Sequence, residues 1–140
     1  MRPFVCRIAD GLWQSAFVDA QRWIGAAKHV DLTVYMAGES PPLYEGVEHI
    51  NYPIADNADG CTCLDAVRAL AREVAGRRVL TICHAGENRS GLLSALILVE
   101  RGMAPDEAVA LVQANGSHNS PTQPHSFWNP GFVRQILEIT

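Results

Sequence analysis

The chain has 140 residues, of which 48% are hydrophobic and 19% are charged, values typical of a folded globular protein rather than a disordered or fibrous one. Its length predicts a single domain over residues 1–140, which buries roughly two-thirds of its surface. The formal net charge of −4 supplies no broad cationic field, which disfavours binding to duplex nucleic acid.

Neither the hydropathy nor the cysteine content indicates export or a membrane. The longest apolar stretch, Leu92 to Val99, contains Ser94 and is far too short to span a bilayer. The first residues do not read as a secretory leader, so the cysteines are expected to be reduced thiols rather than a disulfide framework. We therefore expect a cytoplasmic monomer without membrane contacts.

Short extended segments alternate with amphipathic helices along the chain, the pattern of an α/β protein. Glycine and proline residues separate these segments and place the turns between them. In the first half the pattern predicts a strand and turn over 8–14, a helix capped by Asp19 over 19–28 that buries Ala20, Trp23, Ile24 and Ala27, and strands over 30–36 and 47–54.

The second half is predicted to be mainly helical. Apolar residues cover nearly every side of the segment 89–101, so this helix should be the central, buried one. The other expected elements are a helix over 62–75 that begins with a capping box of Thr62 and Asp65, a strand over 79–82, helices that begin at Pro105 and Pro130, and a long polar loop over 115–128.

The segment from Cys83 to Ser90 places a cysteine at the end of a strand and an arginine at the start of the buried helix. The backbone N–H groups of so short a loop can converge, and the helix N-terminus adds partial positive charge, which together form an anion site that also favours a thiolate. Arg89 can hold two phosphoryl oxygens at once, which a lysine cannot. The predicted phosphate-binding residues are His84, Ala85, Gly86, Glu87, Asn88 and Arg89.

Two further residues of this segment have expected roles. Gly86 permits the tight turn that the loop needs. The Ser90 hydroxyl is placed to donate a hydrogen bond to the Cys83 sulfur and to help it depart as a leaving group.

Residues 83–90, Cys-His-Ala-Gly-Glu-Asn-Arg-Ser, match the Cys-x5-Arg-Ser/Thr signature of the protein tyrosine phosphatases. The flanking sequence resembles a small dual-specificity phosphatase over residues 8–139, including the turn at 102–105 and a segment at 129–137 similar to the family's Asn-x-Gly-Phe-x-x-Gln-Leu. Sulfurtransferases and arsenate reductases share the bare Cys-x5-Arg motif, so the flanking pattern is what favours a phosphatase. The resemblance implies a central, mostly parallel sheet flanked by helices.

The resemblance also implies a reaction. Cys83 attacks a phosphomonoester to form a phosphocysteine, and Arg89 with the loop amides stabilises the equatorial oxygens, with no metal or cofactor. The substrate would be a phosphorylated protein or a small phosphoester. Because the short chain leaves little room for loops that deepen the pocket, we expect phosphotyrosine and also phosphoserine or phosphothreonine to be accepted.

The family uses a general acid on an upstream loop. Residues 52–56, Tyr-Pro-Ile-Ala-Asp, are similar to the family's Ile-Pro-x-x-Asp segment, which makes Asp56 the candidate. Its distance from Cys83 along the chain is somewhat short for the family, so Asp59 is the alternative. The carboxyl group would act first as an acid and then as a base on the attacking water.

One position departs from the family pattern. The residue before the nucleophile is usually histidine, and here it is Ile82. A histidine would support the loop and the thiolate, so we expect a working but less activated Cys83.

Two other functions remain open from the sequence. The segment Asn88-Arg89-Ser90-Gly91 is similar to the Asn-Arg-Thr-Gly of RNA 5′-triphosphatases that share this fold, although the acidic balance argues against RNA. Because Ile82 stands in place of the histidine, the second alternative is a phosphate-binding module with weak or no catalysis.

Two groups of side chains outside the motif each have two interpretations. Cys61 and Cys63 are expected to begin a helix rather than bind zinc, and either is a candidate resolving thiol for Cys83. The basic residues Arg68, Arg72, Arg77 and Arg78 are expected to form a solvated face, with substrate docking as the alternative.

Overall fold

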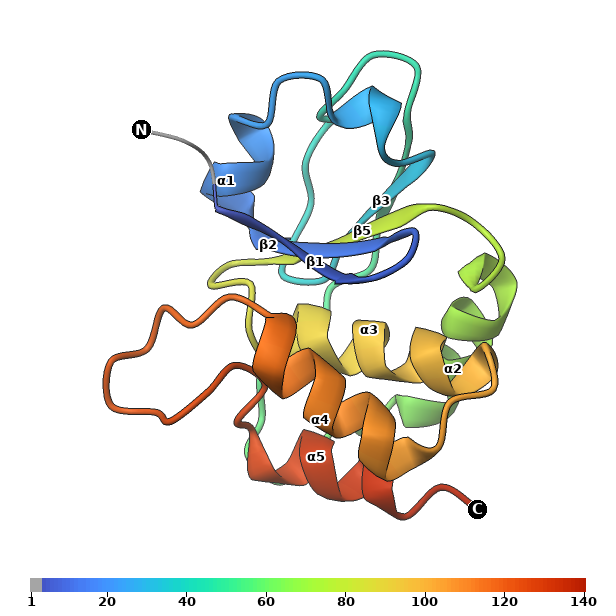
Figure 1. The fold of residues 1–140 in the computed structure, drawn as a ribbon, viewed down its shortest axis with the longest axis vertical. Helices are drawn as coiled ribbons and strands as arrows, with labels where there is room; N and C mark the ends of the chain where they lie inside the picture. The colour runs from blue at the N-terminus through green and yellow to red at the C-terminus, as the bar shows by residue number, and fades with distance from the viewer. Residues whose placement is uncertain (1–3) are drawn as a thin grey trace.

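The computed structural model describes residues 4–140, which form one five-stranded sheet with helices on both faces (Figure 1). The strand order is β1-β2-β5-β3-β4, with β1 antiparallel to β2 and the other pairs parallel. The predicted α/β domain with a mostly parallel sheet is therefore confirmed. The strands are β1 (Val5–Ala9), β2 (Leu12–Ala16), β3 (Leu32–Tyr35), β4 (Glu48–Asn51) and β5 (Val79–Cys83).

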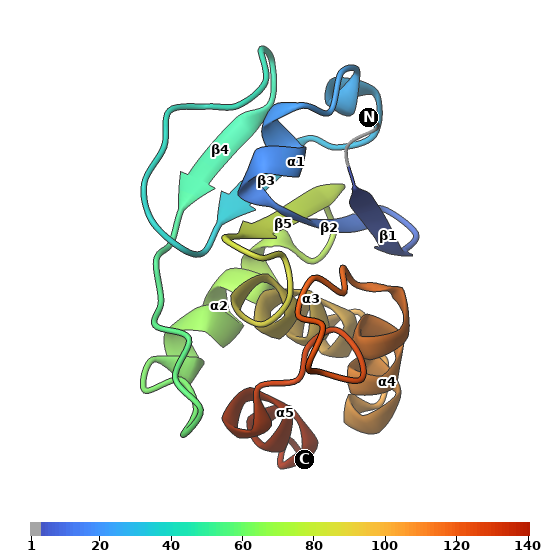
Figure 2. The same ribbon diagram turned by 90° about the vertical axis from the view of Figure 1, so that its left-hand side faces the viewer.

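The two faces of the sheet are covered unequally. Within residues 4–140, one face carries only the short helix α1 (Phe17–Gln21) and the 3-10 turn η1 (Ala26–Lys28), whereas four helices pack on the other (Figures 1 and 2). Among residues 4–140, no helix is both long and apolar enough to cross a membrane. The four helices are α2 (Leu64–Val74), α3 (Arg89–Glu100), α4 (Pro105–Asn115) and α5 (Pro130–Leu137).

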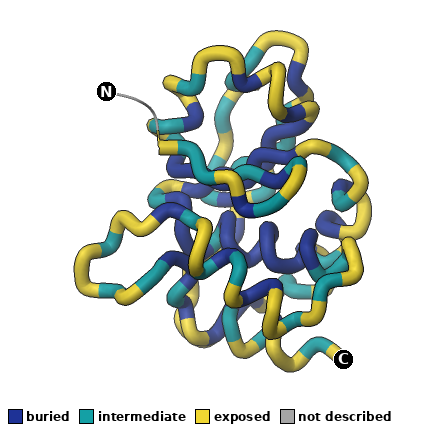
Figure 3. The backbone as a smooth tube through the Cα atoms, in the orientation of Figure 1, coloured by how far each residue is buried: buried dark blue, intermediate teal, exposed yellow. Residues whose placement is uncertain are grey.

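Helix α3 is the central element of the four-helix layer. Every residue from Ser90 to Leu98 is buried, and its backbone is dark blue over most of its length in Figure 3. The helix contacts β5 on one side and α2, α4 and α5 on the others. The predicted burial of this helix is confirmed, and its N-terminus follows the end of β5 after a short connection.

Strand β5 is buried on both faces, and its residues alternate between the two layers. Val79 and Cys83 belong to the large core on the α3 side, and the Thr81 hydroxyl lies 2.8 Å from that of Ser94 in α3. Leu80 and Ile82 belong to the smaller core beneath α1. Since successive side chains of a strand point to opposite faces, Cys83 leaves the sheet toward the N-terminus of α3.

The prediction of one helix over 19–28 is wrong. Gly25 has a φ of +82°, a left-handed conformation that interrupts the helix between α1 and η1. The Asp19 carboxylate accepts a hydrogen bond from the Phe4 amide rather than capping a helix. Ile24, expected to be buried, has 97% of its surface exposed.

The other helix starts test the predicted capping. Helix α2 forms, but the expected capping box does not, because Cys63 is the N-cap and no side chain caps the helix. Helices α4 and α5 begin at Pro105 and Pro130 as predicted, positions where the missing proline N–H removes no helical hydrogen bond.

Candidate active site

The candidate nucleophile lies where β5 meets α3. Strand β5 ends at Cys83 and α3 begins at Arg89, so residues 84–88 form a five-residue connection. The Cys83 Sγ lies 3.1 Å from the Ser90 Oγ, and both side chains are buried. The hydroxyl is thus in position to donate to the sulfur, as the sequence predicts. We call residues 83–90 the Cys83 loop.

Gly86 lets the Cys83 loop press against the neighbouring strand. Its φ is +75°, and a Cβ atom there would lie 2.4 Å from the Ala16 nitrogen and 2.5 Å from the Ser15 carbonyl carbon. The fully buried Gln14 donates from Nε2 to the Gly86 carbonyl at 2.8 Å. Sequence analysis missed Gln14, and the available signal is a large amide side chain inside a short strand that also contains Leu12, Trp13 and Ala16.

A second segment, residues 116–129, holds the outer side of the Cys83 loop. The buried Glu87 carboxylate accepts hydrogen bonds from the Ser120 hydroxyl at 2.6 Å and from the Asn119 amide at 3.3 Å. The Asn119 side chain in turn donates to the Ala85 carbonyl at 2.7 Å. Figure 2 shows this orange segment beside the yellow loop. Glu87 therefore orders the loop by bonding to distant residues, which its place in the motif does not reveal.

Arg89 supplies the charged donors of the site. Its Nη1 lies 3.5 Å from the Ile54 carbonyl, and its Nε is buried with no hydrogen-bond partner among residues 4–140. A buried N–H without an acceptor is costly, so the environment of this guanidinium fits an anion that accepts its hydrogen bonds. His84, at the start of the loop, is exposed.

The carboxylate of Asp56 is tied directly to the Cys83 loop. Its Oδ1 accepts from the Asn129 side chain at 2.7 Å, and its Oδ2 is 3.4 Å from the Nδ2 of Asn88. The backbone amide of Asn129 also donates to the Asn88 Oδ1 at 2.9 Å. These contacts join the upstream acid, the loop and the start of α5.

Asp59, the alternative acid, lies in a different environment. Its backbone amide bonds to the Asn57 side chain and its carbonyl accepts from Arg134. Its carboxylate makes no hydrogen bond to any of residues 4–140 in the structure, whereas that of Asp56 makes two. The geometry therefore favours Asp56.

Asn129 has a second role at the start of α5. Its Oδ1 accepts from the Phe132 amide at 3.1 Å and caps the helix, while its Nδ2 donates to Asp56. Gly131 allows the first turn of α5 to approach the backbone of residues 58–60, which follow Asp56, because a Cβ there would lie 2.2 Å from the Gly60 nitrogen. The Asn-Pro-Gly sequence thus fixes α5 against the segment that carries the acid.

Ile82 replaces polar support with apolar packing. The side chain is fully buried and lies on the face of β5 opposite to that of Cys83. It therefore contributes to the smaller core and offers no hydrogen bond to the Cys83 loop. Its buried neighbours in that core are Ala20, Val30, Val47 and Leu80.

Cys61 and Cys63 lie together just before α2. Their sulfur atoms are 2.9 Å apart, and burial is the largest cause that raises the pKa of Cys61, to about 11. Within residues 4–140, no three His, Cys, Asp or Glu side chains are grouped so that they could hold a metal ion.

The aromatic residues near α5 differ in their surroundings. Phe127 is fully buried with a φ of +50°, and its ring packs so closely on Gly91 that a Cβ there would lie 2.7 Å from it. Trp128 is half-buried and its Nε1 has no hydrogen-bond partner among the residues described. Phe127 therefore packs against α3 rather than lining an open site.

Comparison with known proteins gives matches in structure alone. No protein-family model matches the chain, and no curated protein is significantly similar to it in sequence. Human DUSP28 superposes with a TM-score of 0.77 at 23% identity, over 97% of this chain and 92% of that one. DUSP15 gives a TM-score of 0.72 at 19% identity, over 96% and 85% of the two chains.

The chain has the fold of the dual-specificity phosphatases. The fold implied by the Cys83 motif is thus confirmed. A protein that is only phosphatase-like has the same fold, since the human tyrosine phosphatase-like serine/threonine/tyrosine-interacting protein superposes with a TM-score of 0.70 at 21% identity, over 98% of this chain and 95% of that one. The dual-specificity phosphatase fold therefore does not by itself establish catalysis, and the site residues have to carry that argument.

Proposed function

We propose that this protein is a cysteine-dependent phosphatase that hydrolyses phosphomonoesters through a phosphocysteine intermediate. The observation that carries the proposal is the buried Cys83 sulfur, 3.1 Å from the Ser90 hydroxyl at the junction of β5 and α3. A thiol at this position lies beside a helix N-terminus, and Arg89 at the start of that helix has a buried Nε without a partner among residues 4–140. Such surroundings stabilise a thiolate and bind a phosphoryl group.

In the first step the Cys83 thiolate attacks phosphorus, and the bond from phosphorus to the ester oxygen breaks. The amides of residues 84–89 and the Arg89 guanidinium stabilise the equatorial oxygens. The Asp56 carboxylic acid gives its proton to the departing oxygen, so the alcohol or phenol leaves neutral.

In the second step a water molecule attacks the phosphocysteine. The Asp56 carboxylate, now the base, takes a proton from that water, and the bond from sulfur to phosphorus breaks. The Ser90 hydroxyl donates to the departing Cys83 sulfur, which leaves as a thiolate. Inorganic phosphate is released and the enzyme returns to its starting state, without a metal or another cofactor.

The proposed substrates are phosphorylated proteins or small phosphoesters in the cytoplasm. Phosphotyrosine is the main expected group, with phosphoserine and phosphothreonine also accepted. Because Asp56 is exposed and lies at the surface, its carboxyl group would reach the longer side chain of phosphotyrosine as well as the shorter ones of phosphoserine and phosphothreonine.

The experiment measures phosphate release from a small aryl phosphate and a phosphotyrosine peptide without added metal, with wild-type protein and Cys83→Ser. We expect turnover by the wild type and none by the variant. A 5′-triphosphate RNA is assayed in parallel, and faster release from it would favour the triphosphatase alternative. If both proteins bind phosphate and neither turns over, the protein is a binding module.

A further inference from the structure

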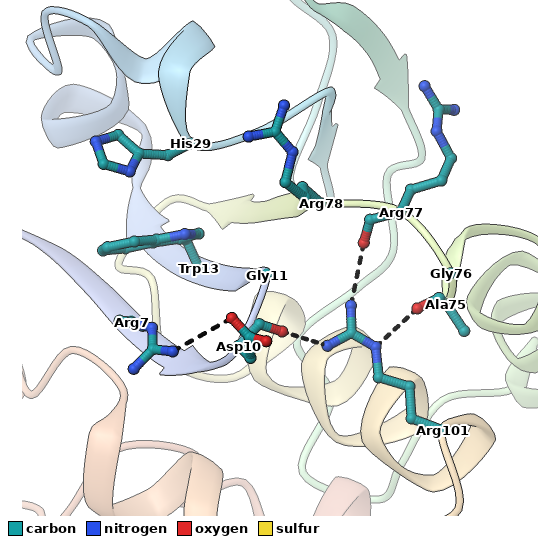
Figure 4. A pocket seen from close by; sticks show the side chains of 10 residues that line it. All are labelled: Arg7, Asp10, Gly11, Trp13, His29, Ala75, Gly76, Arg77, Arg78 and Arg101. Carbon is teal, nitrogen blue, oxygen red and sulfur yellow. Dashed lines mark hydrogen bonds and ion pairs between the residues drawn. The ribbon is translucent and has the colours of Figure 1, made fainter.

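A second candidate site lies at the opposite edge of the sheet. A cavity of about 570 Å³ opens beside the turn before β2 and the turn before β5 (Figure 4). The Cys83 loop instead follows the carboxyl end of β5. The proposed catalytic residues do not line the cavity. We call it the arginine cavity, and its lining residues are Arg7, Asp10, Gly11, Trp13, His29, Ala75, Gly76, Arg77, Arg78 and Arg101.

Cations outnumber anions in the lining, on a protein whose net charge is negative. Arg7 pairs with Asp10 at 3.4 Å, and both side chains are more than half exposed. Arg77 and Arg78 pair with acids outside the lining, at 3.1 and 2.7 Å. The Arg7 and Arg77 pairs are exposed single contacts that contribute little free energy, so a more highly charged anion can displace their carboxylates. Arg78 instead holds Asp31 through two hydrogen bonds, from Nε at 3.2 Å and from Nη2 at 2.7 Å.

Arg101 is held in place without an acidic partner. Its three nitrogens donate one hydrogen bond each, to the carbonyls of Ala75 at 2.7 Å, Asp10 at 2.8 Å and Arg77 at 3.1 Å. It makes no ion pair with any of residues 4–140. A guanidinium has five N–H donors, so two remain for a ligand. Partial burial lowers the pKa of Arg101.

One wall of the arginine cavity is aromatic. The rings of Trp13 and His29 meet edge to face with their centroids 5.3 Å apart. Figure 4 shows these rings on one side and Arg77 and Arg101 on the other, with Arg78 between them. Both rings also pack on Trp23, which holds them in place. The cavity therefore offers a partly apolar aromatic wall next to several guanidinium groups.

We propose that the arginine cavity binds a nucleotide with at least two phosphates. Its volume of about 570 Å³ lies within the range of small-molecule sites and exceeds what a single phosphate fills. The phosphates would contact Arg7, Arg77 and the free donors of Arg101, since guanidinium groups bind phosphate oxygens in pairs. The base would lie against Trp13 and His29. This binding does not depend on catalysis at Cys83.

Nuclear magnetic resonance titration tests the proposal, because it reports which residues a ligand contacts. ¹⁵N-labelled Cys83→Ser protein, which cannot hydrolyse the probe, is titrated with ADP. We expect saturable shifts at Gly11, Gly76 and the Trp13 indole. Shifts confined to the Cys83 loop, or shifts that do not saturate, would overturn the proposal. Adenosine and inorganic pyrophosphate are titrated separately, and pyrophosphate binding as tight as that of ADP would exclude the role of the base.

Variants distinguish binding in the arginine cavity from nonspecific attraction between ADP and positive charge. Arg7→Ala with Arg77→Ala removes two exposed side chains and keeps the backbone carbonyl that accepts from Arg101. We expect ADP affinity to fall by about tenfold or more, with aryl phosphate turnover unchanged. Arg72→Ala with Arg134→Ala removes two exposed arginines outside the cavity. It is the matched control and should bind ADP as the unmodified protein does. Equal loss in both variants, or in neither, would contradict the proposal.

Discussion

The two segments that meet at the candidate active site are held in different ways. The Cys83 loop is contiguous in sequence, mostly buried, and continuous with β5 and α3. The segment from Ala55 to Asp59 is exposed throughout, and its acid is held by Asn88 and Asn129. A local motif thus places the proposed nucleophile, whereas contacts distant in sequence place the proposed general acid. Changes in the loop should therefore remove almost all turnover, and changes in the acid segment should remove only part.

The largest loss of activity is expected for Arg89→Lys in the Cys83 loop. Lysine keeps the positive charge but loses the paired N–H donors that a phosphoryl group accepts, so kcat/KM for an aryl phosphate should fall by about 10²–10³-fold, as for loss of a transition-state donor. Arg134→Lys, on the exposed face of α5, is the control and should match wild type. Activity in Arg89→Lys within a factor of a few of wild type would show that the guanidinium does not bind the transferred group.

Asp56→Asn should have the next largest effect. Loss of the proposed general acid should lower kcat by about 10²-fold for a phosphoserine peptide, whose leaving group needs a proton. The loss should be smaller for an aryl phosphate with an acidic phenol. Asp59→Asn serves as the matched control, since its carboxylate lacks contacts with the Cys83 loop, and the reverse outcome would assign the acid to Asp59.

Asn129 tests whether positioning and stability can be separated. Asn129→Ala removes the cap of α5 and the donor to Asp56, so unfolding free energy should fall by about 1 kcal/mol and kcat should fall as well. Asn129→Asp keeps the capping oxygen but places a second carboxylate beside Asp56. It should retain most of the stability measured by chemical denaturation and still lose kcat. Equal kcat in Asn129→Asp and wild type would mean that this contact does not position the acid.

The contrast also explains what the sequence could predict. Cys83, Arg89 and Ser90 share one strand-loop-helix unit, so their proximity follows from local structure. The choice between Asp56 and Asp59 does not, because it depends on amide side chains that only the folded chain brings together. The same holds for Gln14 in β2, whose hydrogen-bond partner Gly86 lies in the loop that connects β5 to α3.

The elements show a similar division. The apolar sequence of α3 and the prolines at the starts of α4 and α5 act locally, and the structure forms those helices as predicted. The predicted helix over 19–28 fails because apolar spacing alone does not reveal that Gly25 adopts a left-handed conformation. Tertiary packing then leaves Ile24 exposed, against its hydrophobicity.

Ile82→His is expected to have the smallest effect on catalysis. Residue 82 lies on the face of β5 opposite to that of the Cys83 sulfur, within an apolar core, so an imidazole there gains no contact with the loop. We expect kcat to stay within a factor of a few of wild type, while unfolding free energy falls by roughly 1–3 kcal/mol because a polar ring is buried without a partner. Ile82→Val, which costs about 1 kcal/mol by loss of a methyl group, is the control for altered packing. A tenfold or greater gain in kcat would instead show that the histidine supports the thiolate through the strand, and that apolar packing at residue 82 limits this enzyme.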